Sequence, residues 1–324
     1  MNATGAPNIE SRLRPPPGAA RVPRFDEGWL AEDGSRRAFL SYVTVEHSGA
    51  AAESLERIHE EIARTHCFDV WTRRAMLTRL GVLPPDATVI DIGCASGFLL
   101  QDLHRNAPQV TLIGLDLLGS GLRKAHAAIP EALLLQADAC ALPLADASVD
   151  GVASANLLEH VSNDERVLAE IFRILRPGAR AVIVVPLGPH IYDYYDRFVG
   201  HERRYAHGEL ARKARAAGLR VLEDICLGAL LYPAFWAVKL RNRHLYGDLR
   251  GEALARRVTR DVERTESSPL GHAACRLEEM LLHRGVRLPF GIRGLTVLER
   301  CRVDPISTQA APHVDWHTGG AFAS

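Results

Sequence analysis

Residues 89–98 read Val-Ile-Asp-Ile-Gly-Cys-Ala-Ser-Gly-Phe, an apolar run that ends in a turn with two glycines. The run has the length and β-branched content of a buried strand, and a helical pattern follows it. A glycine turn between a strand and a helix presents backbone N–H groups and the helix N-terminus to a ligand. This stretch therefore predicts a ligand-binding strand–loop–helix unit in an α/β fold.

The chain around this unit alternates short apolar runs with helical segments, as βαβ units do. The runs are almost continuously apolar, which is typical of strands that helices cover on both faces of a parallel sheet. The expected strands are residues 88–92, 110–115, 132–137, 149–155, 179–185, 219–227 and 292–299. We predict a Rossmann-like sheet of seven strands with helices on both faces, the last strand being antiparallel and inserted at the sheet edge.

The remaining segments complete this organisation. The expected parts are a disordered tail at 1–25, an N-terminal helical cover at 26–84, a main domain at 85–303 with a helical insertion at 229–288, and a second disordered tail at 304–324. Three consecutive prolines and the lack of apolar periodicity indicate disorder in the first tail. Within the cover, helices are expected over 52–64 and 70–80, and the insertion is expected to cover the substrate.

Local signals mark the ends of several helices. Ser162 and Glu165 have the spacing of a capping box, and Pro177 with Gly178 ends the helix that they open. Ser268-Pro269 is expected to open a helix of the insertion, because Ser favours the N-cap and Pro the first helical position.

Composition excludes several classes of protein. The 324 residues include 39 Lys+Arg and 39 Asp+Glu, so net charge gives no general attraction to nucleic acid. The N-terminus lacks an apolar signal-peptide core, and the longest uncharged, mostly apolar stretch, 225–238, is too short to span a bilayer. The six cysteines form no C-x-x-C pair, so we expect a reducing, cytoplasmic protein with no zinc site.

The charge around the glycine turn separates two classes of nucleotide ligand. A dinucleotide loop needs G-x-G-x-x-G, and Ala95 and Phe98 break that pattern. Asp91 would repel a pyrophosphate and attract a cation. Asp116, 23 residues after Gly93, ends the next strand, where a carboxylate accepts bonds from ribose hydroxyls. S-adenosylmethionine (SAM), which has a sulfonium and an adenosine but no phosphate, suits this arrangement.

Residues 88–185 resemble the class I SAM-dependent methyltransferases of the type 11 group. Five motifs carry the resemblance: 91–97 resembles the D-x-G-x-G-x-G loop, Asp116 the ribose-binding acid, 136–144 the stretch whose Asp138 lies by the adenine, 150–161 the fourth-strand motif, and 170–178 the R-V-L-K-P-G-G ending. One position departs from the family pattern, because Ala95 replaces the middle glycine of the loop.

The resemblance implies SAM as cofactor and an in-line transfer of methyl to an O, N or C nucleophile of a small molecule, including natural-product or quinone- and lipid-like acceptors. The residues expected to bind the cofactor are Asp91, Gly93, Cys94, Ala95, Gly97, Asp116, Leu117, Asp138, Ala139 and Asn156. An inactive SAM-fold scaffold is the alternative, and Ala95 is the feature that supports it. A nicotinamide-dependent oxidoreductase is disfavoured by the missing glycine pattern.

Two histidines are candidate general bases, namely His160 and His201. Glu159 and His160 together are too few to argue a metal site, since Asn156 stands where a further acid would help, and we expect no metal. His160 could equally cap a helix or pack beneath SAM. His201 belongs to the block 200–205, Gly-His-Glu-Arg-Arg-Tyr, which is either a substrate clamp or an ion-paired hinge.

An apolar-aromatic stretch at 230–236 precedes Lys239, Arg241 and Arg243. It is compatible with contact to a membrane or a lipid-like substrate. We favour the wall of a substrate cover or a homodimer surface. The expected partners are therefore a small-molecule acceptor and a second copy of the chain, and no nucleic acid.

Overall fold

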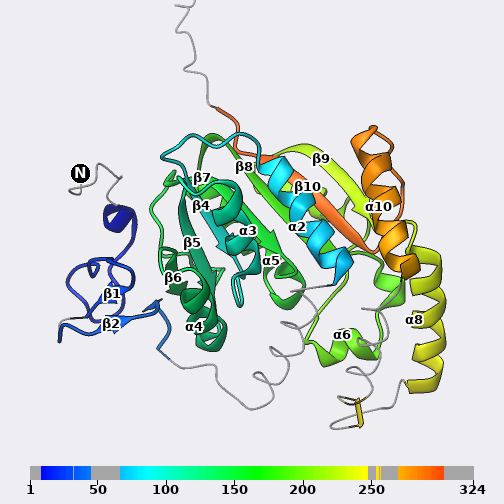
Figure 1. The fold of residues 1–324 in the computed structure, drawn as a ribbon, viewed down its shortest axis with the longest axis horizontal. Helices are drawn as coiled ribbons and strands as arrows, with labels where there is room; N and C mark the ends of the chain where they lie inside the picture. Colours follow the sequence, from blue (N-terminus) through cyan, green and yellow to red (C-terminus); the bar gives the residue numbers. More distant parts are fainter. Residues whose placement is uncertain are drawn as a thin grey trace, which may run out of the picture.

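The computed structural model describes residues 9–31, 33–44, 66–246, 253–254, 256 and 269–302. Its centre is an eight-stranded sheet of order β3-β6-β5-β4-β7-β8-β10-β9 (Figure 1). The strands are β3 (Leu40–Ser41), β4 (Thr88–Ile92), β5 (Thr111–Asp116), β6 (Leu133–Gln136), β7 (Val149–Ala155), β8 (Leu175–Pro186), β9 (Arg220–Leu227) and β10 (Arg293–Glu299). The seven expected strands are all present, so the apolar runs predicted them correctly.

The strand directions also follow the prediction, with one correction. From β3 to β8 every neighbouring pair is parallel, whereas β10 runs antiparallel to both β8 and β9. The last strand is therefore inserted one place inside the edge, and β9 is the edge strand. The interior position of β10 accounts for its almost complete burial.

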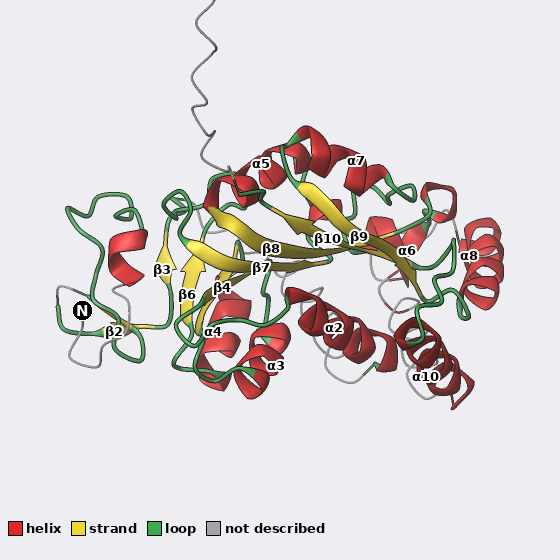
Figure 2. Cartoon of the chain, turned by 90° about the horizontal axis from the view of Figure 1, so that it is seen from above, coloured by secondary structure: helices red, strands yellow, loops and turns green. Residues whose placement is uncertain are grey.

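Helices cover both faces of the sheet (Figure 2). They are α2 (Cys67–Leu80), α3 (Phe98–Asn106), α4 (Gly119–Ala128), α5 (Asp164–Ile174), α6 (Tyr194–Phe198), α7 (Glu209–Ala216), α8 (Tyr232–Tyr246) and α10 (Pro269–His283). Helices α2, α3 and α4 lie on one face and α5 and α7 on the other, while α8 stands beyond the β9 end of the sheet. No helix among the described residues is long and apolar enough to cross a bilayer.

Helix ends differ in one place from the sequence prediction. The N-cap of α5 is Asn163, whose side-chain oxygen accepts a hydrogen bond from the Arg166 N–H at 3.0 Å. Ser162 lies one residue before this cap, and its hydroxyl donates to Glu202 at 2.6 Å. Helix α10 begins at Pro269 as expected. The expected helix at 52–64 lies outside the described residues.

The N-terminal region is more ordered and less helical than expected. Leu13 is buried and pairs with Leu144, and the Arg12 guanidinium donates to the Thr88 hydroxyl at 2.6 Å. Trp29 is 1% exposed, and its indole N–H donates to the Leu134 carbonyl oxygen at 3.0 Å. Burial of these apolar side chains offsets the entropy of ordering residues 9–25, which were expected to be disordered.

The segment that follows the N-terminal tail, the first part of the expected helical cover, forms short strands, whereas the helix expected at 70–80 is present as α2. Strands β1 (Trp29–Leu30) and β2 (Arg36–Arg37) pair as a separate antiparallel ladder. Strand β3 then joins the main sheet beside β6. The N-terminal region therefore adds an eighth strand to the sheet.

Candidate functional site

The glycine loop, residues 91–97, joins β4 to α3 at the carboxyl edge of the sheet. Gly93 and Gly97 have φ values of +82° and +79°, a left-handed conformation that glycine adopts without strain. The Gly93 and Cys94 N–H groups both donate to the Leu115 carbonyl oxygen, at 2.7 and 3.0 Å. A Cβ on Gly93 would stand 3.0 Å from the Leu157 Cβ. The loop is thus held against β5 and closely approached by the segment after β7.

Ala95 lies in the same loop with a φ of +44°. Its N–H donates to Asp116 Oδ2 at 2.9 Å, while Asp116 Oδ1 accepts from the Leu118 N–H, also at 2.9 Å. This carboxylate therefore fastens the loop to the end of β5. The loop keeps its turn despite the alanine, at a strain of roughly 1–2 kcal/mol for a left-handed non-glycine residue.

Two acidic side chains, Asp91 and Asp116, lie close together at the loop. Asp91 is 2% exposed, and burial together with the negative charge of Asp116 raises its pKa to about 8. A nearby positive charge would favour the ionised form. The Ser96 hydroxyl is also buried, and it has no hydrogen-bond partner among the described residues. The loop therefore suits a ligand that brings both a cationic group and polar atoms.

The other expected cofactor residues gather at the same edge. Leu117 follows β5, Asp138 and the buried Ala139 follow β6, and Asn156 follows β7. These strands are parallel neighbours of β4, so their carboxyl ends meet. Asp138 closes its turn by accepting from the Cys140 N–H at 2.8 Å. The structure brings all ten expected positions to one edge of the sheet.

A second group of polar side chains, the ligand cluster, comprises Glu159, His160 and His201. Glu159 is fully buried, and neither of its carboxylate oxygens has a hydrogen-bond partner in the described part of the chain. Burial raises its pKa to about 8. The His201 Nε2 atom lies 3.8 Å from Glu159 Oε1, and the two imidazole rings are 4.7 Å apart between centroids. Both candidate bases are therefore brought together beside a buried carboxyl group.

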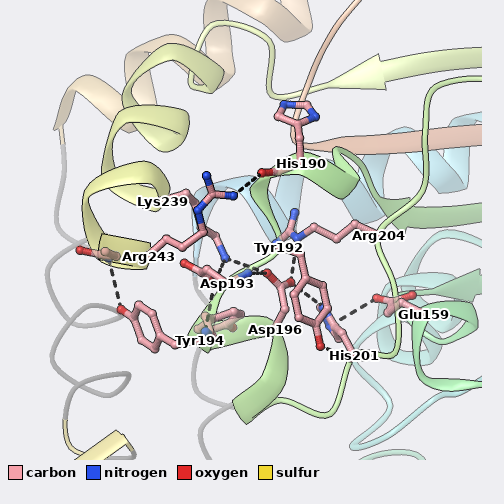
Figure 3. A network of polar contacts seen from close by, with 12 residues as sticks. Glu159, His190, Tyr192, Asp193, Tyr194, Asp196, His201, Arg204, Lys239 and Arg243 are labelled. Atoms are coloured by element: carbon pink, nitrogen blue, oxygen red, sulfur yellow. Dashed lines mark hydrogen bonds and ion pairs between the residues drawn. The ribbon is translucent and has the colours of Figure 1, made fainter. Parts of the chain in front are cut away.

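An ion-pair network holds His201 in place (Figure 3). Its members are Asp193, Asp196, His201, Arg204 and Lys239. Asp196 lies 2.8 Å from His201 Nδ1 and 2.7 Å from Arg204 Nε, and Lys239 Nζ lies 3.1 Å away. Burial alone would raise the pKa of Asp196, but the His201 hydrogen bond and the two positive charges outweigh burial and lower it. Burial also lowers the pKa of His201, against the opposing effect of Asp196.

The network is relevant to the two hypotheses for residues 200–205, a substrate clamp and an ion-paired hinge. Arg204 is 7% exposed and also donates to the Leu187 carbonyl oxygen at 3.1 Å. Tyr205 is fully buried, with its hydroxyl donating to Asp164 at 2.7 Å. The polar groups of these two residues are therefore bonded within the protein. A clamp on the substrate would need their polar groups free to face it.

Sequence reasoning missed Lys239 as part of this network. It was grouped with Arg241 and Arg243 as a basic surface beside the apolar stretch, whereas the structure buries it with 6% exposure. Its Nζ lies 2.6 Å from Asp193 Oδ1, so α8 is tied to the segment after β8. Trp236, by contrast, is 43% exposed on the same helix. No local pattern distinguishes a lysine whose partner lies 46 residues away.

Comparison with known proteins agrees with this geometry. Residues 90–183 match the family model described as a methyltransferase domain. The demethylmenaquinone methyltransferase of Thermus thermophilus is 34% identical over 118 residues, which cover 35% of this chain and 53% of that protein. The trans-aconitate 2-methyltransferase of Azoarcus is 32% identical over 161 residues, which cover 49% of this chain and 60% of that protein. The chain thus spans between half and two thirds of the length of these relatives.

A solved structure has a similar fold. A protein in complex with the Haloferax volcanii Trm112 methyltransferase activator has a TM-score of 0.53 at 21% identity, over 78% of this chain and 97% of that one. The sheet order and the glycine loop define a Rossmann-like methyltransferase fold. Residues 90–183 match the methyltransferase-domain family model, and the relatives named above are methyltransferases, as the sequence resemblance to class I SAM-dependent methyltransferases predicts. The resemblance seen in the sequence is therefore confirmed.

The residues of the glycine loop fit the family cofactor. Asp91 and Asp116 offer negative charge to a ligand with a sulfonium and an ammonium group. The Ser96 hydroxyl is a buried polar group with no protein partner among the described residues. The absence of a side chain at Gly93 leaves room beside Leu157 that a Cβ would take.

Proposed function

We propose that this chain transfers a methyl group from SAM to an O, N or C nucleophile of a small-molecule acceptor. The observation that carries the proposal is the glycine loop, with its paired carboxylates Asp91 and Asp116 at the carboxyl edge of a methyltransferase sheet. SAM supplies an activated methyl group on its sulfonium, and alignment of that group with the acceptor supplies most of the rate.

Residues in and around the glycine loop are proposed to bind different parts of the cofactor. Asp91 faces the end of SAM that carries the sulfonium and the ammonium group. Asp116 accepts backbone hydrogen bonds from Ala95 and Leu118, and its proposed role in the complex is to accept from the ribose hydroxyls as well. Asp138 and Ala139 border the adenine, and Gly93 and Gly97 let the backbone approach the ligand. Each of these roles is a proposal that rests on position in the fold.

The acceptor lies on the side of the ligand cluster. Leu157 contacts the space beside Gly93 and is only two residues from Glu159, so the cluster adjoins the cofactor loop. His160 and His201 therefore stand where an acceptor that must lose a proton would be handled. Relatives named for demethylmenaquinone and for trans-aconitate support a small molecule as acceptor.

A labelling experiment tests this function. The purified chain is incubated with methyl-labelled SAM and a small-molecule extract of the organism that encodes it, and new labelled ions are sought by mass spectrometry. A labelled product supports the proposal and identifies the acceptor. SAM binding in calorimetry with no product across extracts would favour the inactive scaffold. Absence of SAM binding would contradict the proposal outright.

A further inference from the structure

The ligand cluster has the composition of a metal site. One donor atom from each of Glu159, His160 and His201 lies within 4.8 Å of the other two. Two imidazoles and one carboxylate are a ligand set that binds divalent first-row metals such as zinc and iron. His201 comes from a segment 41 residues after His160, so no spacing pattern in the sequence indicates the third ligand.

Each imidazole of the cluster is oriented through its Nδ1 atom. His201 Nδ1 lies 2.8 Å from Asp196 Oδ1, and His160 Nδ1 lies 3.2 Å from the Gly200 carbonyl oxygen. Histidines that bind metals commonly donate their other ring N–H to a carboxylate or a backbone carbonyl, which fixes the ring and its tautomer. This arrangement directs the His201 Nε2 atom toward Glu159, 3.8 Å away (Figure 3).

The buried carboxylate is the independent observation that points to a ligand. Glu159 is 0% exposed, and both of its oxygens lack a hydrogen-bond partner in the described residues. Buried carboxyl groups ordinarily have a hydrogen-bond partner or coordinate a metal. Arg293 is paired with Asp69 and Arg204 with Asp196, so the neighbouring cations already have a carboxylate partner.

We propose that Glu159, His160 and His201 bind one divalent transition-metal ion and leave a coordination position open for the acceptor. Zinc–nitrogen and zinc–oxygen distances of about 2.0–2.2 Å place tetrahedral ligand atoms roughly 3.3 Å apart. Relative to separations of up to 4.8 Å, the cluster therefore contracts by up to about 1.5 Å when it binds the ion. The expectation of no metal, drawn from the sequence, considered only the adjacent Glu159 and His160.

The open coordination position indicates the chemical class of the acceptor. This step rests on the proposed function. A bound divalent ion lowers the pKa of a coordinated hydroxyl, so it replaces a general base. The acceptor is then an oxygen nucleophile, such as a phenol or an enol. Its O–H proton leaves to solvent, the new O–CH₃ bond forms, and the S–CH₃ bond breaks with its electron pair returning to sulfur.

Metal binding is measured directly on the full-length chain. The chelator-treated protein is titrated with Zn²⁺ by calorimetry, and Co²⁺ is added separately so that its visible absorption reports the ligand geometry. We expect one ion per chain, with affinity lowered at least 100-fold in Glu159→Gln and His160→Ala. Asp196→Asn, which keeps the size of the side chain but removes the negative charge beside His201, Arg204 and Lys239, should weaken binding about 10- to 100-fold, and its thermal unfolding is measured in parallel. Glu202→Gln and His190→Ala are matched controls that should bind as the wild type does.

The outcomes separate this proposal from the proposed function. Wild-type protein that binds no ion, or ligand variants that bind as tightly as the controls, would overturn the metal site. SAM titrations of the same variants should be unchanged, because the ion lies outside the cofactor loop. If Glu159→Gln does not fold, as judged by its thermal unfolding, His160→Ala at its half-buried position carries the test. Transfer of label to a nitrogen or carbon atom would overturn the oxygen acceptor.

Discussion

The glycine loop and the ion-pair network lie along the same edge of the sheet, but they are assembled differently. The loop is seven consecutive residues, and much of its ligand surface is backbone held by hydrogen bonds to Leu115 and Asp116. The network joins side chains from the segment after β8 to Lys239 on α8. A site made of backbone in one loop leaves a motif in the sequence, whereas a site made of distant side chains does not.

Removing the central carboxylate of the network should have the largest effect on stability. Asp196→Ala leaves Lys239, Arg204 and His201 buried without their shared partner, and we expect a loss of about 3–5 kcal/mol in the free energy of unfolding. Urea denaturation measures it. Asp26→Ala, which breaks the exposed pair with Arg36, should cost about 0–1 kcal/mol. Equal losses in the two variants would mean that the network does not stabilise the fold.

A side chain added to the glycine loop should have the next largest effect on stability. Gly97→Ala adds a Cβ that would lie 2.9 Å from the Ala125 Cβ, at a φ of +79°. We expect a loss of roughly 2–3 kcal/mol in unfolding free energy, in part from left-handed strain. Gly34→Ala has a similar φ but nothing within 4 Å, so it measures the strain alone. If both variants lose the same stability, close packing of α3 on α4 does not contribute.

Loss of Asp116 should lower SAM affinity more than it lowers the stability of the fold. Asp116→Ala removes a carboxylate that fastens the loop and is proposed to bind ribose. We expect SAM affinity to fall about 10- to 30-fold, about 1.5–2 kcal/mol, as for the loss of charged hydrogen bonds. Calorimetric titration of both proteins provides the measurement. Identical binding curves would remove Asp116 from the cofactor site.

The raised pKa of Asp91 predicts a pH dependence of cofactor binding. With a pKa of about 8, this carboxyl group is protonated at neutral pH in the free protein, so a cationic ligand must displace its proton. SAM affinity should therefore rise with pH up to about 8 and level off above it, by at most tenfold per pH unit. Asp91→Asn should bind more weakly, with this dependence absent. A wild-type affinity that is flat between pH 6 and 8 would contradict the proposed contact.

The smallest expected effect is a gain in stability at Ala95, the position that departs from the family pattern. Ala95→Gly relieves a left-handed residue at φ +44° and should stabilise the fold by about 1 kcal/mol. Ala147→Gly is the matched control, because Ala147 has a φ of +49° away from the loop. Both should raise the melting temperature, and only Ala95→Gly should alter SAM affinity. A large gain in affinity would indicate that the alanine restricts the cofactor.

Most of the sheet could be predicted because each interior strand is buried on both faces and so must be apolar throughout. Strands β4 and β7 have the predicted ends, and the others differ by a few residues. Strand β3 escaped prediction because two residues at an edge leave no periodic signal. The cap of α5 was assigned to Ser162 because two adjacent residues can cap. Only the fold shows that Asn163 is the cap and that the Ser162 hydroxyl donates to Glu202, 40 residues away.

The candidate site likewise has a part that the sequence could predict and a part that it could not. The order of the motifs around residues 91–178 was enough to predict the family and its cofactor loop, because the left-handed turn residues Gly93 and Gly97 lie within one short stretch of the chain. The burial of Lys239, the pairing of Asp196 with His201 and the approach of His201 to Glu159 depend on where β8, α6 and α8 are packed. These contacts were decided by tertiary structure alone, because the free energy of a buried charge depends on partners that the folded chain brings together.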